Sequence, residues 1–288
     1  VMQMKWLQAI QTKQPQHKYA INAAMLGDHN ELAWSNLGYW NHTHDSYPQA
    51  CRQLAIHLAT AIDLNSKDKL LDLGCGKGAS LVLWHEHFKV QQIEAVELQA
   101  ACVDNIQNKL KQIHSIQLQN IQQGSFLNLK QCHFEFKFDV VLCIDAAYHC
   151  HLNSFLTSVN AVLNSKARIG FHSLMLTEKF HSLSTFQKIK LKTLLKCADV
   201  ELSDLMDHQG IENLLGEQGF ENIQIENLTQ KVLKGFADYI KQRSLSKSLE
   251  KASSRLDRFK IEMTAKLCRK LYIDGCVNYV QISAQKRN

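Results

Sequence analysis

The sequence predicts an α/β protein built on a doubly wound, mostly parallel sheet. Short apolar runs alternate with segments of helical periodicity along most of the 288 residues, and this alternation is typical of parallel sheets with helices on both faces. Three alternate glycines, Gly74, Gly76 and Gly78, follow the first of these runs. A hydrophobic content of 45% is enough for one sizeable core, or for a core domain with an elaboration.

Seven runs have the length and the apolar character of buried strands. We expect strands at Lys69–Leu73, Ile93–Glu97, Ile116–Ile121, Phe138–Ile144, Ala167–Ser173, Ile223–Leu228 and Val277–Ala284.

Helices are predicted between these strands from the spacing of their apolar residues. One runs from about Tyr47 to Ala61, and others cover Ala100–Ile113 and Leu152–Leu163. In the last of these, Phe155 and Val159 recur at the i, i+4 spacing of a single helix face. A further helix is expected to begin directly after the glycines.

The most informative stretch joins the first strand to that helix, with the sequence Leu70-Leu71-Asp72-Leu73-Gly74-Cys75-Gly76-Lys77-Gly78. Glycine lets the backbone approach a ligand closely because it carries no Cβ. Backbone N–H groups at the start of the following helix would face that ligand. We therefore expect a nucleotide-type cofactor site at this turn.

Two cofactor classes fit the glycines, because Gly74, Gly76 and Ala79 also satisfy a dinucleotide fingerprint. Asp72 narrows the choice. A carboxylate at the mouth of the turn would repel a pyrophosphate but attract an ammonium or sulfonium group. S-adenosylmethionine carries both of these cations and no phosphate. Glu97 ends the next strand and can bind ribose hydroxyls in either cofactor.

These motifs resemble those of the class I S-adenosylmethionine-dependent methyltransferases, over most of the chain. Residues 71–78 match the first motif of the family without a departure, and Glu97 matches its ribose-binding acid. Gly124-Ser125-Phe126 stands where the family usually has Gly-Asp-Ala beside the adenine, so Ser125 replaces the usual acid. Residues 138–143 match the fourth strand, and residues 145–149 match the segment that faces the methyl group. The resemblance implies a Rossmann-like, seven-stranded sheet with a reversed final strand.

The resemblance also implies which residues bind S-adenosylmethionine and its product S-adenosylhomocysteine. The expected cofactor-binding residues are Tyr39, Asp72, Gly74, Cys75, Gly76, Gly78, Glu97, Leu98, Ser125, Phe126 and Cys143. The acceptor pocket is expected to include Asp145, Tyr148 and His149.

Gly38-Tyr39-Trp40 precedes the first predicted helix. In several small-molecule and lipid methyltransferases that this chain resembles, a similar segment closes over the methionine end of the cofactor. The Tyr39 hydroxyl could then reach a carboxylate. The alternative is that these aromatic residues only anchor the N-terminal helix.

His149 is the candidate catalytic residue, because a histidine beside the methyl group has a pKa near the operating pH and could accept a proton from the acceptor. The alternative is that it only holds the loop. Methyl transfer is a direct displacement, and alignment and desolvation can accelerate it without a base.

Three segments exceed what the sheet needs. We divide the chain into an N-terminal helical cap (1–66), a cofactor-binding core (67–230, with an insertion over about 177–200), a helical cap insertion (231–273) and the last core strand (274–288). Ligands of doubly wound sheets bind beyond the carboxyl ends of the strands, where the later insertions emerge. We expect the caps to enclose a small acceptor.

Composition argues against several other classes of protein. The net charge of +6 is not patterned as a nucleic-acid-binding tail, and no nucleic-acid partner is expected. No run of 18 apolar residues predicts a membrane span, and the first residues are too polar for a signal peptide. Nine cysteines at irregular spacing indicate reduced thiols of a cytoplasmic protein. Without a suitable His-x-x-x-His pair, no metal site is expected.

The predicted function is therefore methyl transfer from S-adenosylmethionine to a small or medium-sized organic acceptor, at oxygen, nitrogen or an activated carbon, by a monomer or homodimer. Three alternatives remain: a lipid- or fatty-acid-directed methyltransferase, a partner protein that binds the cofactor without chemistry, and a dehydrogenase. Methylation of nucleic acids or protein amides fits less well, because Cys143-Ile144-Asp145-Ala146 lacks the Pro-Pro pair usual in those enzymes. The basic stretch Lys241–Lys260 could meet nucleic acid or anionic lipid, although its mixed charges are typical of a solvated helix face.

Overall fold

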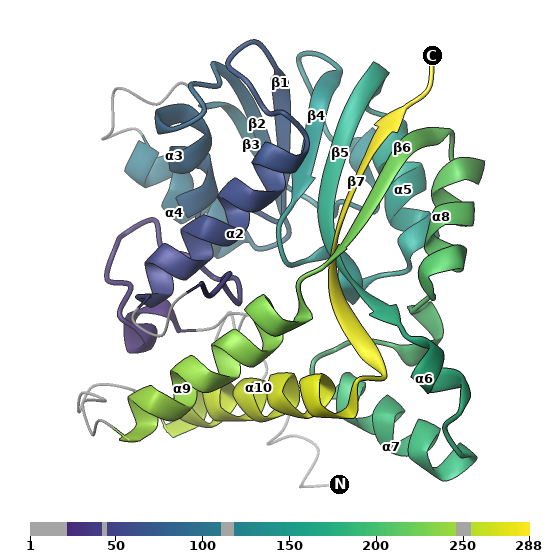
Figure 1. The fold of residues 1–288 in the computed structure, drawn as a ribbon. Helices are drawn as coiled ribbons and strands as arrows, with labels where there is room; N and C mark the ends of the chain where they lie inside the picture. Colours follow the sequence, from purple (N-terminus) through teal and green to yellow (C-terminus); the bar gives the residue numbers. More distant parts are fainter. Residues whose placement is uncertain (1–21, 42–44, 111–117, 246–254) are drawn as a thin grey trace, which may run out of the picture.

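A seven-stranded sheet forms the centre of the molecule (Figure 1). The computed structural model describes residues 22–41, 45–110, 118–245 and 255–288. The strand order is β3-β2-β1-β4-β5-β7-β6, and only β7 runs antiparallel to its neighbours. The strands are β1 (Lys69–Leu73), β2 (Gln92–Glu97), β3 (Leu118–Gln123), β4 (Phe138–Cys143), β5 (Leu163–Leu176), β6 (Phe220–Asn227) and β7 (Val277–Lys286). The predicted doubly wound sheet with a reversed last strand is confirmed.

Helices cover both faces of the sheet. α2 (Tyr47–Ala61), α3 (Ala79–Glu86) and α4 (Ala100–Leu110) pack on one face. α5 (Leu152–Asn160) and α8 (His208–Glu217) pack on the other. This three-layer arrangement buries both sides of a parallel sheet, as the alternation of strands and helices predicts.

The central strands are apolar at nearly every position because both of their faces are buried. In β1, Leu70 packs in the cluster under α2 and α3, whereas Leu71 and Leu73 pack in the cluster under α5 and α8. Successive side chains of a strand point to opposite faces. Asp72 therefore points to the same face as Leu70, and unlike Lys69 at the start of the strand it is a fully buried charged residue.

Two predicted boundaries differ from the structure around β5. The helix expected to reach Leu163 ends at Asn160, because Leu163 already pairs with Phe138 of β4. β5 also extends to Leu176, well beyond the predicted end at Ser173. The cause is a long antiparallel ladder of hydrogen bonds with β7. The residues of β5 by themselves do not predict this pairing. Parts of the predicted helix 100–113 and strand 116–121 lie outside the described residues.

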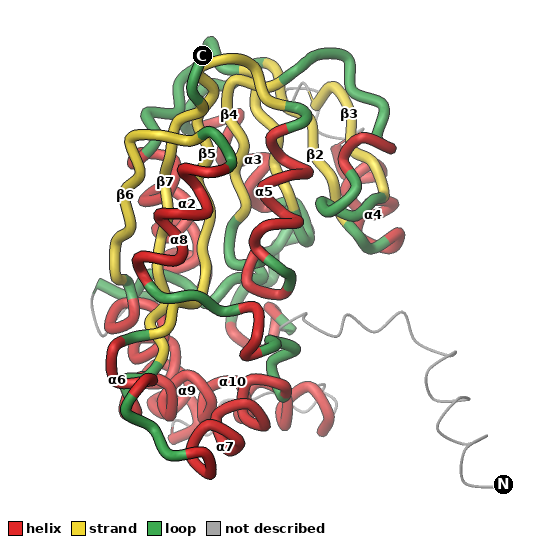
Figure 2. The backbone as a smooth tube through the Cα atoms, turned by 90° about the vertical axis from the view of Figure 1, so that its right-hand side faces the viewer, coloured by secondary structure: helices red, strands yellow, loops and turns green. Residues whose placement is uncertain are grey.

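A helical cap lies beyond the carboxyl ends of the parallel strands, at one end of the molecule in both views (Figures 1 and 2). We use "cap" for α6 (Glu178–His181), α7 (Thr185–Lys196), α9 (Gly235–Leu245) and α10 (Arg255–Asp274). Both late insertions therefore contribute to it. Among the described residues, none of the helices combines the length and apolar character that crossing a membrane requires.

The N-terminal region divides between the cap side and the sheet. Residues 33–40, which we call the strap, pack in one cluster with the cap helices. α2 belongs to both: Tyr47, Ala50 and Leu54 pack in the cluster of the cap helices, whereas Ala55, Leu58 and Ala59 pack against the sheet. An apolar face of this helix lies over β5 and β7, where Leu58 and Ile62 approach Gly170. The domain boundaries themselves stay a prediction.

Candidate active site

The glycine turn after β1 adopts backbone angles that favour glycine. Gly74, Gly76 and Gly78 have φ angles of 68°, 57° and 90°, in the left-handed region that costs other residues free energy. Gly74 N–H donates to the carbonyl of Val96 at 2.8 Å, and Gly76 N–H donates to Glu97 Oε2 at 2.9 Å. The turn is therefore tied to the end of the neighbouring strand β2.

Glu97 holds this end of the sheet together. Besides Gly76, it accepts a hydrogen bond from the backbone N–H of Gln99 at 3.1 Å. Its burial raises the pKa of the carboxyl group, and the backbone N–H groups oppose this rise. Each carboxylate oxygen has two lone pairs, so Glu97 retains acceptor capacity for hydroxyl groups at the turn.

Asp72 is a buried acid directly beneath the turn. It is 1% exposed and accepts a hydrogen bond from the indole N–H of Trp84 at 2.6 Å. Burial raises the pKa of Asp72 to about 6, although the side chains of Ser80 and Trp84 oppose the rise by hydrogen bonding. No ion pair joins Asp72 to a cationic side chain in the described part of the chain. A buried carboxylate without a cation is costly unless a positive ligand accompanies it.

A pocket opens beside Asp72, between the strap, the glycine turn and the end of β4. It is lined by Ala33, Trp34, Ser35, Asn36, Asp72, Gly74, Cys75, Ala79, Ser80 and Ile144. The hydroxyl of Ser80 is buried beside Asp72, where it helps to lower the pKa of the carboxyl group, and no other group of the described residues is hydrogen-bonded to it. A buried acid that has only hydroxyl and indole donors and no cation indicates that a cationic ligand completes this pocket.

The strap is held over the turn by a set of specific hydrogen bonds. Asp28 accepts the N–H of Trp34 at 2.8 Å, and Tyr47 donates its hydroxyl to the carbonyl of Asn36 at 2.9 Å. A Cβ on Gly76 would lie 2.6 Å from Ser35 Oγ. The strap therefore touches the glycine turn so closely that the turn has no room for a side chain there.

Asp145 is the centre of a second polar cluster, at the end of β4. One of its oxygens accepts hydrogen bonds from the hydroxyls of Tyr148 and Tyr279, both at 2.8 Å, and the other accepts the N–H of Leu37 at 2.8 Å. Burial raises its pKa to about 6, against these hydrogen bonds. Its own N–H donates to Nδ1 of His172, whose pKa burial lowers to about 3, so that this histidine is neutral.

His149 lies on the acceptor side of this cluster. Its ring stands 4.4 Å from the Tyr148 ring, and its Nδ1 lies 3.3 Å from the carbonyl of Asp199, just beyond α7. The three residues predicted to line an acceptor pocket are thus brought together. None of the three lines the pocket beside Asp72. Of the described residues that follow β4, only Ile144 lines that pocket.

The other predicted cofactor residues differ in position. Cys75 lines the pocket, and the Phe126 ring lies beside Gly74 and edge-on to Phe155. Ser125 uses its hydroxyl to accept the N–H of Leu127 at 3.2 Å. Leu98 is exposed after β2.

Cys143 and Tyr39 do not point into the pocket. Cys143 is fully buried and packs in the core under α5. Tyr39 stacks on His57 of α2, with ring centroids 4.9 Å apart, and lies under the ammonium group of Lys231. These positions do not show whether Cys143 or Tyr39 contacts a bound cofactor, so both assignments stay predictions.

Seven residues that line the pocket were not among the predicted site residues: Ala33, Trp34, Ser35, Asn36, Ala79, Ser80 and Ile144. Ser80 could have been found, because the second residue of the helix after the glycines faces the same ligand as the helix N-terminus. The strap residues carried no such signal, since only the tertiary fold brings them over the turn.

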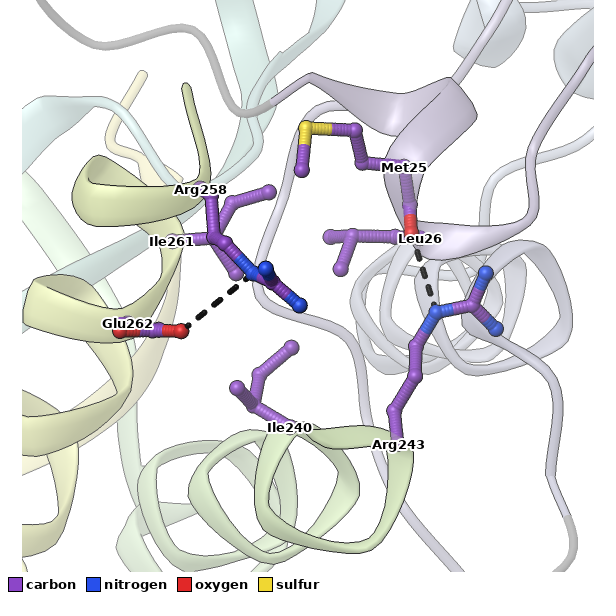
Figure 3. A pocket seen from close by; sticks show the side chains of 7 residues that line it. All are labelled: Met25, Leu26, Ile240, Arg243, Arg258, Ile261 and Glu262. Carbon is purple, nitrogen blue, oxygen red and sulfur yellow. Dashed lines mark hydrogen bonds and ion pairs between the residues drawn. The ribbon is translucent and has the colours of Figure 1, made fainter. Parts of the chain in front are cut away.

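A separate pocket lies between η1 (Ala23–Leu26) and helices α9 and α10, as Figure 3 shows. The two arginines that line it, Arg243 and Arg258, interact with other groups of the protein. Arg243 donates from Nε to the carbonyl of Met25 at 3.0 Å, and Nε of Arg258 lies 3.7 Å from Glu262. This site braces η1 against the cap.

The chemistry of the first pocket fits S-adenosylmethionine. Asp72 supplies a negative charge without a cationic partner, Ser80 a hydroxyl beside it, and Glu97 a carboxylate on the neighbouring strand. No group of three or more His, Cys, Asp and Glu residues in the described part of the chain could hold a metal ion.

Comparison with known proteins gives a consistent result. Residues 70–166 match the family model of a methyltransferase domain. Erythromycin 3''-O-methyltransferase of Saccharopolyspora erythraea is 23% identical over 240 residues, which cover 78% of this chain and 74% of that protein.

The solved structures that are similar in fold include the following two. A cyclopropane synthase from Mycobacterium tuberculosis has a TM-score of 0.73 at 14% identity, covering 94% of this chain and 96% of that one. Geranyl diphosphate C-methyltransferase from Streptomyces coelicolor A3(2), in complex with S-adenosylhomocysteine, has a TM-score of 0.66 at 16% identity, covering 92% of each chain.

Proposed function

Because this chain is a class I S-adenosylmethionine-dependent methyltransferase, we propose that it methylates a small or medium-sized organic acceptor, at oxygen, nitrogen or an activated carbon. The observation that carries the proposal is the cover over the carboxyl ends of the strands. The strap packs directly against α9 and α10 there, in one apolar cluster with Leu37, Phe236 and Ile261. A covered site of this kind suits a ligand that the protein can enclose.

The names of the relatives support this size of acceptor. One is named for methylation of erythromycin at an oxygen, and another for methylation of geranyl diphosphate at a carbon. Both are small molecules. The comparison does not indicate which atom this chain methylates, because one relative is named for methylation at oxygen and the other for methylation at carbon.

We assign the cofactor to the pocket beneath the strap. Asp72 and Ser80 would hold the methionine end, because the acid attracts cations and the hydroxyl lines the same pocket beside it. Glu97 would accept hydroxyl groups of the ribose, and Phe126 with Ser125 would border the adenine. The cofactor, when bound, supplies a methyl group on a positively charged sulfur. Trp34 and Asn36 of the strap would exclude water from this group.

The acceptor would lie beyond β4, beside Tyr148 and His149. Asp145 acts there as a positioning residue, because its carboxylate is engaged by Leu37, Tyr148 and Tyr279. His149 remains the candidate for accepting a proton from the acceptor. The contact between Nδ1 of His149 and the carbonyl of Asp199 orients the imidazole ring.

The acceptor class can be tested directly. The full chain is incubated with methyl-labelled S-adenosylmethionine and, separately, with a library of small hydroxyl, amine and activated-carbon compounds, with total RNA and with unfolded protein. Label is expected in small products that mass spectrometry resolves. Label that enters only RNA or protein would overturn the proposal.

The role of His149 needs a second readout, because a loop-holding residue would also lower activity. For His149→Ala, we expect the loss of the acidic limb of the kcat–pH profile, with the affinity for S-adenosylhomocysteine unchanged. A profile that keeps its shape while activity falls would assign His149 to holding the loop.

A further inference from the structure

Helix α7 has an unusual outer face. Phe186 and Ile189 are 64% and 57% exposed, although they lie within a helix whose other face is buried. Leu191 and Leu195 fill that buried face and pack into the apolar cluster shared by the cap and the strap. The helix is therefore firmly seated, and its exposed apolar side chains are not explained by local packing.

The same helix is strongly basic. Its 12 residues, Thr185–Lys196, contain four lysines and no acid. Lys190 lies over the Phe186 ring with its ammonium group 4.4 Å from the ring centroid, and Lys188 lies over Phe180 of α6 at 5.1 Å. Of the four lysines, Lys196 forms an ion pair with Glu201 at 3.4 Å, and no ion pair joins the other three to an acid among the described residues.

Helix α7 lies where a basic, apolar surface is accessible to a partner. Figures 1 and 2 both place α7 at the extreme end of the molecule, farthest from the upper end of the sheet. α10 lies at the same end and exposes Phe259, Met263 and Ile273. Most other large apolar side chains of the described residues are covered, so exposed apolar surface gathers on the cap.

We propose that α7 docks the protein on the surface of an anionic lipid bilayer. A helix that combines exposed aromatic and aliphatic residues with lysines lies in the plane of a membrane interface, with its apolar side chains in the acyl boundary. The lysines match the negative charge of the headgroups, and the net charge of +6 has the same sign. A nucleic acid would use the lysines but leave Phe186 and Ile189 in water. The bilayer is the partner that uses both.

The docking surface is distinct from the cofactor pocket, because none of the α7 residues lines that pocket. It also does not depend on which acceptor is methylated. The loop after α7 carries Asp199, whose carbonyl contacts His149. Docking would therefore bring the acceptor side of the molecule to the membrane surface.

The test is co-sedimentation of the full chain with sucrose-loaded vesicles, either of phosphatidylcholine alone or with about a third phosphatidylglycerol. The unaltered protein is expected to pellet with the anionic vesicles and much less with neutral ones. Phe186→Ser/Ile189→Ser should weaken binding by at least tenfold, because apolar insertion is lost. Lys188→Gln/Lys190→Gln/Lys192→Gln should weaken it by about fivefold for each charge, and added salt should mimic this change.

Matched controls separate the docking surface from general effects. Leu98→Ser removes a similarly exposed apolar residue, 60% exposed, from the loop after β2. Lys67→Gln/Lys130→Gln/Lys137→Gln removes three exposed lysines outside the cap. Both should bind vesicles as the unaltered protein does, and thermal unfolding should show that every variant is folded. Absence of vesicle binding, equal loss in the controls, or loss with the lysine variant alone would overturn the proposal. The last of these results would indicate a polyanion such as nucleic acid instead.

Discussion

The backbone N–H of Leu37 donates a hydrogen bond to the Asp145 carboxylate, at 2.8 Å and across 108 residues of sequence. This bond connects the strap to the end of β4. Because Tyr148 and Tyr279 donate to the other oxygen, one side chain joins the strap, the acceptor loop and the reversed strand β7. The strap over the pocket beside Asp72 and the proposed acceptor site at the end of β4 therefore depend on a common residue.

We predict that Asp145→Gly loosens the strap. Glycine tolerates the left-handed backbone at this position, where φ is 54°, so the substitution tests the side chain alone. Each buried donor left without an acceptor costs roughly 1–3 kcal/mol, and the affinity for S-adenosylhomocysteine should fall about tenfold because the strap lines its pocket. Chemical denaturation and calorimetry measure the two effects.

Asp145→Asn serves as the conservative comparison for this substitution. Asparagine also tolerates the left-handed region, and its oxygen can accept from Leu37 while the tyrosine hydroxyls rotate to accept from its amide. It should therefore restore most of the lost stability and affinity. If Asp145→Asn behaves like Asp145→Gly, the carboxylate charge and not the hydrogen-bond geometry holds the strap.

A second prediction concerns the pH dependence of stability. The pKa of Asp72 is raised to about 6 in the folded protein, from 3.8. Between these values the native state holds a proton that the unfolded state has released, so the contribution of Asp72 to stability falls as the pH rises through this window. At pH 7.5 the burial of the charge costs about 3 kcal/mol.

Asp72→Asn removes this cost and can still accept from Trp84. The variant should match the unaltered protein near pH 4 and become more stable than it above pH 6, by up to about 3 kcal/mol. Urea titrations of both proteins over this range give the difference directly. A difference that does not change with pH would show that Asp72 is not the group responsible.

The same acid predicts the pH dependence of cofactor binding. Only ionised Asp72 attracts the cationic groups of the ligand, so the affinity for S-adenosylhomocysteine, which retains the ammonium group, should fall by up to about tenfold per pH unit below pH 6. Asp72→Asn should bind weakly at every pH, with a flat profile. Equal affinity of the two proteins at pH 7.5 would remove Asp72 from the site.

The contact between the strap and α9 gives a prediction on packing. A Cβ on Gly235 would lie 2.5 Å from Cβ of Trp40, whose ring stacks on Tyr239 at 4.4 Å. Gly235→Ala should therefore displace Trp40 and lower the free energy of unfolding by about 1–3 kcal/mol, despite the better helix propensity of alanine.

Gly216→Ala is the matched control in α8, because a Cβ there meets nothing within 4 Å. It should stabilise the protein by about 0.5–1 kcal/mol, the difference in helix propensity. The two variants should shift the thermal unfolding temperature in opposite directions. Stabilisation by Gly235→Ala would show that Trp40 does not pack as described.

Much of the core was predictable because its signals are local. The apolar run Lys69–Leu73 and the glycines after it identify a strand and a ligand-binding turn within ten residues of sequence, and the structure places both as expected. The end of β5 was not predictable in this way. It is determined by pairing with β7, about a hundred residues later, and propensity within β5 contains no information about that partner.

The site shows the same division between local and long-range causes. By itself, the sequence determined the sheet, the glycine turn, the acids Asp72 and Glu97, and the resemblance to methyltransferases, because each of these rests on short motifs of neighbouring residues. Only the tertiary structure decided that Ser35 and Asn36 cover the turn, that Asp145 is engaged by Leu37 and two tyrosines, and that α7 presents Phe186 and Ile189 outward. These features depend on contacts between segments far apart in the chain, and such contacts form only when the hydrophobic core brings the segments together.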